Sequence, residues 1–185
     1  MKMTFPVLTT DRLVLRKMAA VDSRDMLTYL SDERVMKHYG MSPFESEQDA
    51  LDEIGWYDKI FETEAGIRWA LQTKEGQVIG SCGFHNRDHR HHRAELGFEL
   101  SAVHWGQGLM REALAAVIAY GFEAMSLNRI QALVEPANAQ CVRLLEKAGF
   151  RREGLLAQYE FTLGKYDDLF MYALVKSEYA NRRPL

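Results

Sequence analysis

A strand, a glycine-rich turn, a long helix and a second strand follow one another between residues 93 and 136 of this 185-residue chain. The first strand reads RAELGFEL, the turn and helix read GQGLMREALAAVIAYGFEAM, and the second strand reads RIQALVEP, which Pro136 ends. Strands connected through a helix are typical of parallel neighbours in one sheet. This stretch therefore predicts at least one parallel pair near the centre of a sheet.

The rest of the chain adds strands and helices around this unit. Alternation of apolar and polar residues predicts strands within residues 11–18, 67–85 and 150–175, with a tight turn at Lys74–Gly76. Helical spacing predicts helices within residues 21–39, begun by Asp22 as N-cap, within residues 45–65, and within residues 138–150, where Gly149 ends the helix. The expected class is α+β with a mixed central sheet, in a single domain over residues 1–185.

Composition excludes several classes of function. The net charge of −3 gives no basic excess of the kind that nucleic-acid binding needs. The two cysteines, Cys82 and Cys141, form no disulfide framework and suit a reducing compartment. No signal-type apolar run begins the chain, and its most apolar helix is too short to span a bilayer. We therefore expect a cytoplasmic protein without a nucleic-acid or membrane partner.

The glycines Gly106 and Gly108 stand where the longest helix begins, although glycine disfavours helix formation. Free backbone N–H groups and the helix dipole make a helix start an anion site. Glycine lets the backbone approach a phosphate closely, and Arg111 could add a charged contact. The alternative is a tight turn that binds nothing. The spacing matches neither the triphosphate P-loop nor the dinucleotide-binding glycine motif.

Four ordered stretches resemble the GNAT superfamily of acetyl-CoA-dependent N-acetyltransferases, most fully its RimJ/RimL-like branch. They are RAELGFEL, WGQGLMREAL, RIQALVEPANAQCVRLLEKAGFRREG and GKYDDLFMYAL. The resemblance implies a mostly antiparallel sheet of six to seven strands with a splayed parallel pair and about four flanking helices. It also implies acetylation of a primary amine, in that branch the N-terminal amine of a protein such as a ribosomal protein.

The same resemblance implies where acetyl-CoA binds. The pyrophosphate would rest on backbone N–H groups between Gly106 and Arg111, and the pantetheine arm would pair with the strand at Phe98 and Leu100. Met110 stands where many members have glycine or alanine, which leaves backbone donation intact. The full set of expected acetyl-CoA contacts is Phe98, Leu100, Trp105, Gly106, Gln107, Gly108, Leu109, Met110, Arg111 and Asn138.

Glu95 and Glu99 are the candidate catalytic carboxylates. Strand alternation places them with Gly97 on one face, opposite Leu96 and Leu100. Two such carboxylates can hold a substrate ammonium and pass its proton to water, and their repulsion would raise one pKa. The alternative is a solvated strand face. Glu95 resembles the position of the base in some GNAT enzymes, so we expect it to act first and Glu99 second.

Asn138 and Cys141 lie one turn apart at the start of the last predicted helix. Asn138 would cap the helix, and the resemblance adds a hydrogen bond to the CoA arm. Cys141 stands where RimL-like members often have serine, a proposed proton donor to the CoA thiolate, and a helix N-terminus would lower its pKa. The alternative is a small buried side chain. Tyr159 and Tyr166 are other possible donors.

The histidine-rich stretch HNRDHRHHR, residues 85–93, suggests a metal site, but its spacing lacks a partner pair. We interpret it as a solvated basic hairpin loop, and expect no metal. Trp56, Tyr57, Phe61 and Trp69 are expected mostly in the core, although some of them could line an acceptor pocket together with Tyr39.

The sequence thus predicts an N-acetyltransferase that uses acetyl-CoA by direct attack of an amine in a ternary complex. The first expected acceptor is a protein N-terminus. The alternatives are a small amine (an amino acid, a polyamine or an antibiotic) and a non-catalytic acetyl-CoA-binding module. Either a monomer or a homodimer is compatible with the sequence.

Overall fold

The computed structural model describes residues 4–181, so residues 1–3 and 182–185 of the expected domain lie outside it. One eight-stranded sheet has the order β1-β2-β3-β4-β5-β6-β8-β7. Its strands are β1 (Leu8–Thr9), β2 (Leu13–Lys17), β3 (Ile67–Thr73), β4 (Val78–Asp88), β5 (Arg93–Leu100), β6 (Arg129–Val134), β7 (Arg151–Thr162) and β8 (Lys165–Val175). The helices are α1 (Ser23–Leu30), α2 (Glu33–Met36), α3 (Glu47–Glu62), α4 (Leu109–Glu123), α5 (Ala139–Lys147) and α6 (Lys176–Ala180), with short 3-10 turns at Ala20–Asp22 and Ala102–His104.

The predicted parallel pair is β5 and β6. These strands pair only from Arg93 with Arg129 to Glu95 with Gln131, and every other pairing in the sheet is antiparallel. Beyond Glu95 the two strands separate, while β5 stays paired with β4 as far as Leu100 and β6 stays paired with β8. The predicted α+β class and the splayed parallel pair are confirmed.

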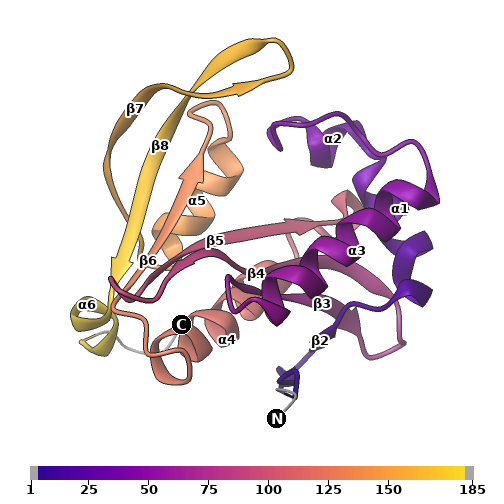
Figure 1. The fold of residues 1–185 in the computed structure, drawn as a ribbon, viewed down its shortest axis with the longest axis horizontal. Helices are drawn as coiled ribbons and strands as arrows, with labels where there is room; N and C mark the ends of the chain where they lie inside the picture. The colour runs from indigo at the N-terminus through magenta and orange to yellow at the C-terminus, as the bar shows by residue number, and fades with distance from the viewer. Residues whose placement is uncertain (1–3, 182–185) are drawn as a thin grey trace.

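The helices cover both faces of the sheet (Figure 1). On one face α4 buries the predicted stripe of Met110, Ala113, Leu114, Val117, Ile118 and Phe122, which joins the larger core cluster. On the other face α1 and α3 form a second cluster around Met26, Tyr29 and Ile54. The larger cluster includes buried residues of β5 and β6, whereas the second cluster packs on β3 and β4, so the sheet lies between two packed layers.

The described residues form eight strands and six α-helices, more than the expected six to seven strands and about four helices. The first predicted helix is interrupted. The helix expected over residues 21–39 is divided into α1 and α2 at Ser31 and Asp32, because the Asp32 side chain accepts the Arg34 N–H and starts a new helix. Asp22 stands at the N-cap of α1 but its side chain does not cap that helix, because its carboxylate pairs with Arg16 and accepts the Ala19 N–H of the preceding 3-10 turn.

The last predicted helix begins and ends as expected. Asn138 accepts a hydrogen bond from the Cys141 N–H at 3.1 Å, and Gly149 follows α5 with a φ of 93°. The turn between β3 and β4 is also confirmed. Within the described residues, the structure has no helix that is both long and apolar enough to cross a membrane.

Candidate active site

The opening between β5 and β6 is the floor of a cavity of about 970 Å³. Leu96, Phe98 and Leu100 line it from β5, and Ala132 and Val134 line it from β6. One end reaches the glycine-rich turn and α5, and the other reaches α2 and α3. The chain therefore provides one continuous site along an edge of β5 that has no ladder partner beyond Glu95.

The glycine-rich turn presents unpaired backbone donors to this cavity. Gly106 and Gly108 have φ values of 77° and 79°, which L-residues rarely adopt. Among the described residues, no backbone N–H group from Gly106 to Arg111 donates a hydrogen bond to another residue. A Cβ at position 106 would meet no atom within 4 Å. The turn thus offers free backbone N–H donors at the start of α4, where the helix dipole is positive, and we call this arrangement the anion cradle.

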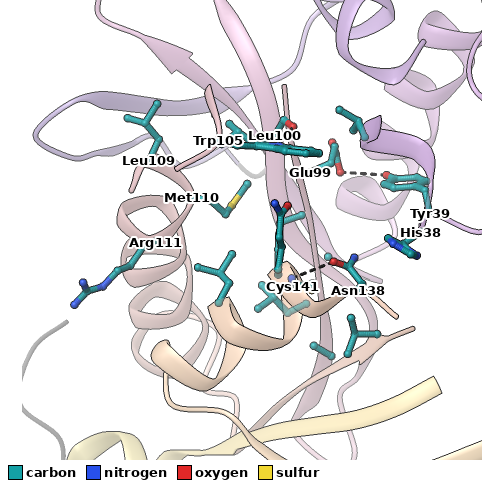
Figure 2. A pocket seen from close by; sticks show the side chains of 18 of the residues that line it. His38, Tyr39, Glu99, Leu100, Trp105, Leu109, Met110, Arg111, Asn138 and Cys141 are labelled. Carbon is teal, nitrogen blue, oxygen red and sulfur yellow. Dashed lines mark hydrogen bonds between the residues drawn. The ribbon is translucent and has the colours of Figure 1, made fainter. Parts of the chain in front are cut away.

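Cationic side chains stand at the same end of the cavity. Arg111 comes from α4, and Arg143 and Lys147 come from successive turns of α5. None of the three forms an ion pair within the described part of the chain. Figure 2 shows the Arg111 side chain directed away from Trp105 and Cys141. This end suits a ligand with several phosphates.

The opposite end contains a buried polar cluster around Glu99. Glu99 pairs with Arg68, accepts a hydrogen bond from Ser81, and accepts another from the Tyr39 hydroxyl at 3.1 Å (Figure 2). Arg68 Nε donates to Ser81 Oγ at 2.6 Å, and the Tyr57 hydroxyl lies 3.1 Å from the same oxygen. A carboxylate with this many partners is held in place, and the role of Glu99 as the second catalytic carboxylate stays a prediction.

Glu95 is also paired, with a histidine that sequence analysis assigned to a loop. His85 lies on β4 in register with Glu95, and its Nε2 is 3.0 Å from Glu95 Oε1. Burial opposes ionisation of Glu95, but the hydrogen bond and charge of His85 outweigh it and lower the pKa of the carboxyl. Repulsion between the two carboxylates therefore does not raise the pKa of Glu95, because Glu99 pairs with Arg68 and Glu95 pairs with His85.

Gly97 lies between the two carboxylates on the same face of β5, as alternation predicted. A Cβ at this position would lie 2.6 Å from Arg68 Nη1 and 3.3 Å from the His85 ring. Only a residue without a side chain therefore lets Arg68 and His85 approach the strand from β3 and β4. The glycine lets Arg68 reach Glu99 and His85 reach Glu95.

Loops cover the end of the cavity that contains Glu95 and Glu99. We call this the anionic end, and these loops its roof. His38, after α2, pairs through Nδ1 with Glu135 at 2.7 Å, beyond the end of β6. Gly40 approaches Thr162 at the tip of the β7–β8 hairpin, where an added Cβ would contact the threonine methyl at 3.3 Å. Glu53 of α3 lines the cavity beneath, and burial raises the pKa of its carboxyl. These contacts leave the anionic end enclosed by parts of the chain far apart in sequence.

Residues 12–151 match the family model of the acetyltransferase (GNAT) domain. The chain belongs to the GNAT acetyltransferase family. It is 40% identical to the uncharacterized N-acetyltransferase p20 of Bacillus licheniformis over 94% of this chain and 98% of that protein. A solved GNAT acetyltransferase from Bacillus anthracis superposes with a TM-score of 0.83 at 27% identity, covering 94% of this chain and 100% of the other. The protein is therefore an N-acetyltransferase, and acetyl-CoA is the acetyl donor that GNAT acetyltransferases use.

Two further relatives have different acceptors in their names. The spermidine N-acetyltransferase of Vibrio cholerae, solved with CoA and spermine, has a TM-score of 0.78 at 27% identity over 91% of this chain and 98% of its own. The putative ribosomal N-acetyltransferase YdaF of Bacillus subtilis is 28% identical over 65% of this chain and 63% of its own. The GNAT resemblance is confirmed, whereas the RimJ/RimL-like branch stays a prediction.

Nearly all residues predicted to contact acetyl-CoA line the cavity between β5 and β6. Gln107 is the exception, because its side chain turns to the Val103 carbonyl and only its backbone belongs to the loop. The Trp105 indole donates to the Leu100 carbonyl at 2.8 Å, at the end of β5. The residues on the cavity are Phe98, Leu100, Trp105, Gly106, Gly108, Leu109, Met110, Arg111 and Asn138.

Cys141 lies on the cavity beside Asn138, but its thiol is not activated (Figure 2). Burial raises the pKa of Cys141 to about 12, so the expected lowering by the helix N-terminus is wrong. Burial is the cause of this shift, because it disfavours the charged thiolate. The alternative donors Tyr159 and Tyr166 are exposed on the β7–β8 hairpin and do not line the cavity.

Neither Arg68 nor His85 was among the residues predicted for the site, although each gave a signal in the sequence. Arg68 is a lone charge in the otherwise apolar start of β3, and a buried charge needs a partner. His85 was grouped with exposed histidines such as His91 and His92, which lie in the turn after β4. Of the expected core aromatics, Trp69 is fully buried and Trp56 lines the cavity. Among the described residues, no group of three or more His, Cys, Asp or Glu side chains is placed to hold a metal ion.

Proposed function

We propose that the acceptor is a cationic primary amine, first of all the N-terminal α-amine of a protein, which attacks acetyl-CoA directly while both substrates are bound. The opposite charges at the two ends of the cavity carry this proposal. Arg111, Arg143 and Lys147 suit the phosphates of CoA at one end, and Glu53 and Glu95 suit an ammonium group at the other. The unpaired edge of β5 between them suits the pantetheine arm.

The proposed reaction needs little from the protein beyond positioning. The neutral amine nitrogen attacks the acetyl carbonyl carbon, and the bond from that carbon to the CoA sulfur breaks, so CoA leaves with the electron pair as a thiolate. Glu95 holds the amine and passes its proton to water, because its carboxylate remains ionised near neutral pH. The thiolate takes a proton from solvent. Glu99 orders the floor of the acceptor site through Arg68 and Tyr39.

A protein N-terminus is supported by the surface next to the roof. The tip of the β7–β8 hairpin carries the exposed aromatic pair Phe161 and Tyr166, whose rings are 4.9 Å apart. Phe161 precedes Thr162, which lies close to Gly40 at the roof. Exposed aromatic groups beside an entrance are typical of surfaces that contact another protein. The likeness to a putative ribosomal N-acetyltransferase agrees with this acceptor.

A polyamine is the second candidate, because carboxylates extend beyond Glu95. Burial and then the charge of Glu95 raise the pKa of Glu160 on β7, which places this carboxylate near the same site. Glu53 and Glu135 add further acidic groups from α3 and the end of β6. A chain with several ammonium groups would meet one carboxylate after another. The likeness to a spermidine N-acetyltransferase agrees with this acceptor.

The test measures CoA release from acetyl-CoA with two separate acceptor pools, one of short peptides with free N-termini and one of polyamines and other small amines. Turnover with the peptides alone supports the first candidate, and turnover with polyamines alone replaces it with the second. Glu53→Gln and Glu160→Gln sharpen the result, because loss of these carboxylates raises KM more for a polyamine than for a peptide amine. CoA binding without turnover in either pool would contradict both acceptors and favour a non-catalytic module.

A further inference from the structure

Arg12 contacts the backbone of the glycine-rich turn without lining the cavity. It precedes β2, lies outside the cavity lining, and donates from Nη1 to the Gln107 carbonyl at 2.8 Å. Its Nη2 lies 3.5 Å from the position of an added Cβ at Gly108. The side chain therefore reaches the backbone of the turn itself.

Arg12 is held in this place by Glu112 in the first turn of α4. Arg12 Nε donates to Glu112 Oε2 at 2.7 Å, and the Arg12 backbone N–H donates to Oε1 at 2.7 Å. The Thr10 hydroxyl donates to the same Oε1 at 2.5 Å. Burial opposes ionisation of Glu112, but these hydrogen bonds outweigh it and hold the pKa of the carboxyl below its usual range. The carboxylate thus fixes both the backbone and the guanidinium of Arg12.

This contact determines which way a backbone donor points. In a planar trans peptide the C=O and the following N–H point in opposite directions, and the described residues contain no cis peptide bond. Because the Gln107 carbonyl points to Arg12, the Gly108 N–H points away from Arg12, and Gly108 lines the cavity whereas Arg12 does not. Glycine on both sides of Gln107 makes this peptide easy to rotate. The turn therefore needs an external group to keep its donors aimed.

We propose that Arg12 is a positioning residue for acetyl-CoA: clamped by Glu112 and Thr10, it orients the Gln107–Gly108 peptide so that the turn presents its N–H groups to the pyrophosphate. The ion pair is half exposed on the Arg12 side, so its direct contribution to folding stability is small. Its effect falls on coenzyme affinity. The inference rests on the acetyl-CoA part of the proposed function and is independent of which amine is the acceptor.

The test compares Arg12→Gln and Arg12→Lys with wild type and with Arg16→Gln. Arg16 is a matched control, because it also lies at β2 and pairs with a carboxylate, Asp22, but it does not line the cavity or touch the turn. Calorimetry measures the Kd for CoA, which needs no acceptor. Steady-state kinetics compare acetyl-CoA with S-acetylpantetheine, which carries the same thioester but no phosphate.

In Arg12→Gln we expect the Kd for CoA and the KM for acetyl-CoA to rise about tenfold, as for loss of a charged hydrogen bond. We expect kcat at saturation and kcat/KM for S-acetylpantetheine to stay within about twofold of wild type. Arg12→Lys keeps the positive charge but lacks the planar guanidinium with its several N–H donors, so it should recover part of the affinity for CoA. Arg16→Gln should leave the Kd unchanged.

An unchanged Kd for CoA in folded Arg12→Gln would overturn the role of Arg12. A parallel loss with S-acetylpantetheine would also overturn it, because the effect would then not act through the phosphates. Failure of wild type itself to bind CoA would contradict the coenzyme site, which distinguishes that result from an error about Arg12. Should Arg12→Gln not fold, Arg12→Lys and Glu112→Gln provide the same comparison.

Discussion

Arg68 and Glu99 form an ion pair with side chains only 5% and 3% exposed. Removing one partner of such a pair leaves a buried charge without compensation. Glu99→Gln is therefore expected to lower the free energy of unfolding by about 3 kcal/mol or more. Urea denaturation checks this, with Glu95→Gln as the control, because Glu95 is less buried. A stable Glu99→Gln protein that has lost turnover would instead make Glu99 the base.

Glu95→Gln is expected to reduce kcat/KM by about 10²-fold, the usual contribution of a positioned proton-transfer group. The lowered pKa of Glu95 means that wild type keeps this carboxylate ionised from mildly acidic pH upward. The rise of kcat/KM with pH should then follow deprotonation of the acceptor, near pH 8 for a peptide α-amine and near pH 10 for an alkyl amine.

The pH–rate profile of Glu95→Gln checks this assignment. Its height should fall while its midpoint stays with the acceptor amine. A wild-type midpoint that disappears in Glu95→Gln would contradict the assignment and make Glu95 the titrating group. His85→Gln keeps a hydrogen-bond donor without the ring and should fall between wild type and Glu95→Gln.

Cys141→Ala is expected to keep kcat within about threefold of wild type, because a group whose pKa burial raises to about 12 is a weak proton donor. The same pKa predicts slow alkylation of Cys141 by iodoacetamide at neutral pH, followed by mass spectrometry. Rapid alkylation, or a drop of kcat below a tenth in Cys141→Ala with Cys141→Ser active, would restore the predicted donor role.

Gly106→Ala is expected to weaken CoA binding with a small effect on the fold. A Cβ at this position meets no protein atom, so the cost to stability is the left-handed φ of 77°, about 1 kcal/mol. The methyl group would stand where a phosphate approaches the N–H groups. Gly164→Ala is the matched control, since Gly164 has a φ of 80° and equally open surroundings in the β7–β8 turn. Equal CoA affinity in both variants would contradict the anion cradle.

Local patterns in the sequence predicted the elements that local chemistry determines. The apolar stripe of α4, the Asn138 cap and the alternation that places Glu95 and Glu99 on one face of β5 are all found. Ser31 and Asp32 divide the first helix by a cap that competes with continued helical spacing, which periodicity alone does not reveal.

The electrostatics of the site could not be predicted, because they depend on partners from other strands. Arg68 and His85 reach Glu99 and Glu95 through the pairing of β3, β4 and β5. Without that register, two carboxylates on one strand predict repulsion. In the folded protein Glu99 pairs with Arg68 and Glu95 pairs with His85, and Glu112 likewise meets Arg12 across a separation of 100 residues.

The short pairing of β5 with β6 makes the sheet two smaller sheets, β1–β5 and β6–β8, joined by a seam of three residue pairs. A ligand that lies along the free edge of β5 and touches β6 and α5 would bridge the two parts where the seam ends. Coenzyme binding should therefore slow amide hydrogen exchange on both sides of the seam at once, well away from the phosphates. In this enzyme the substrate would act as a mechanical link between the two halves of the molecule.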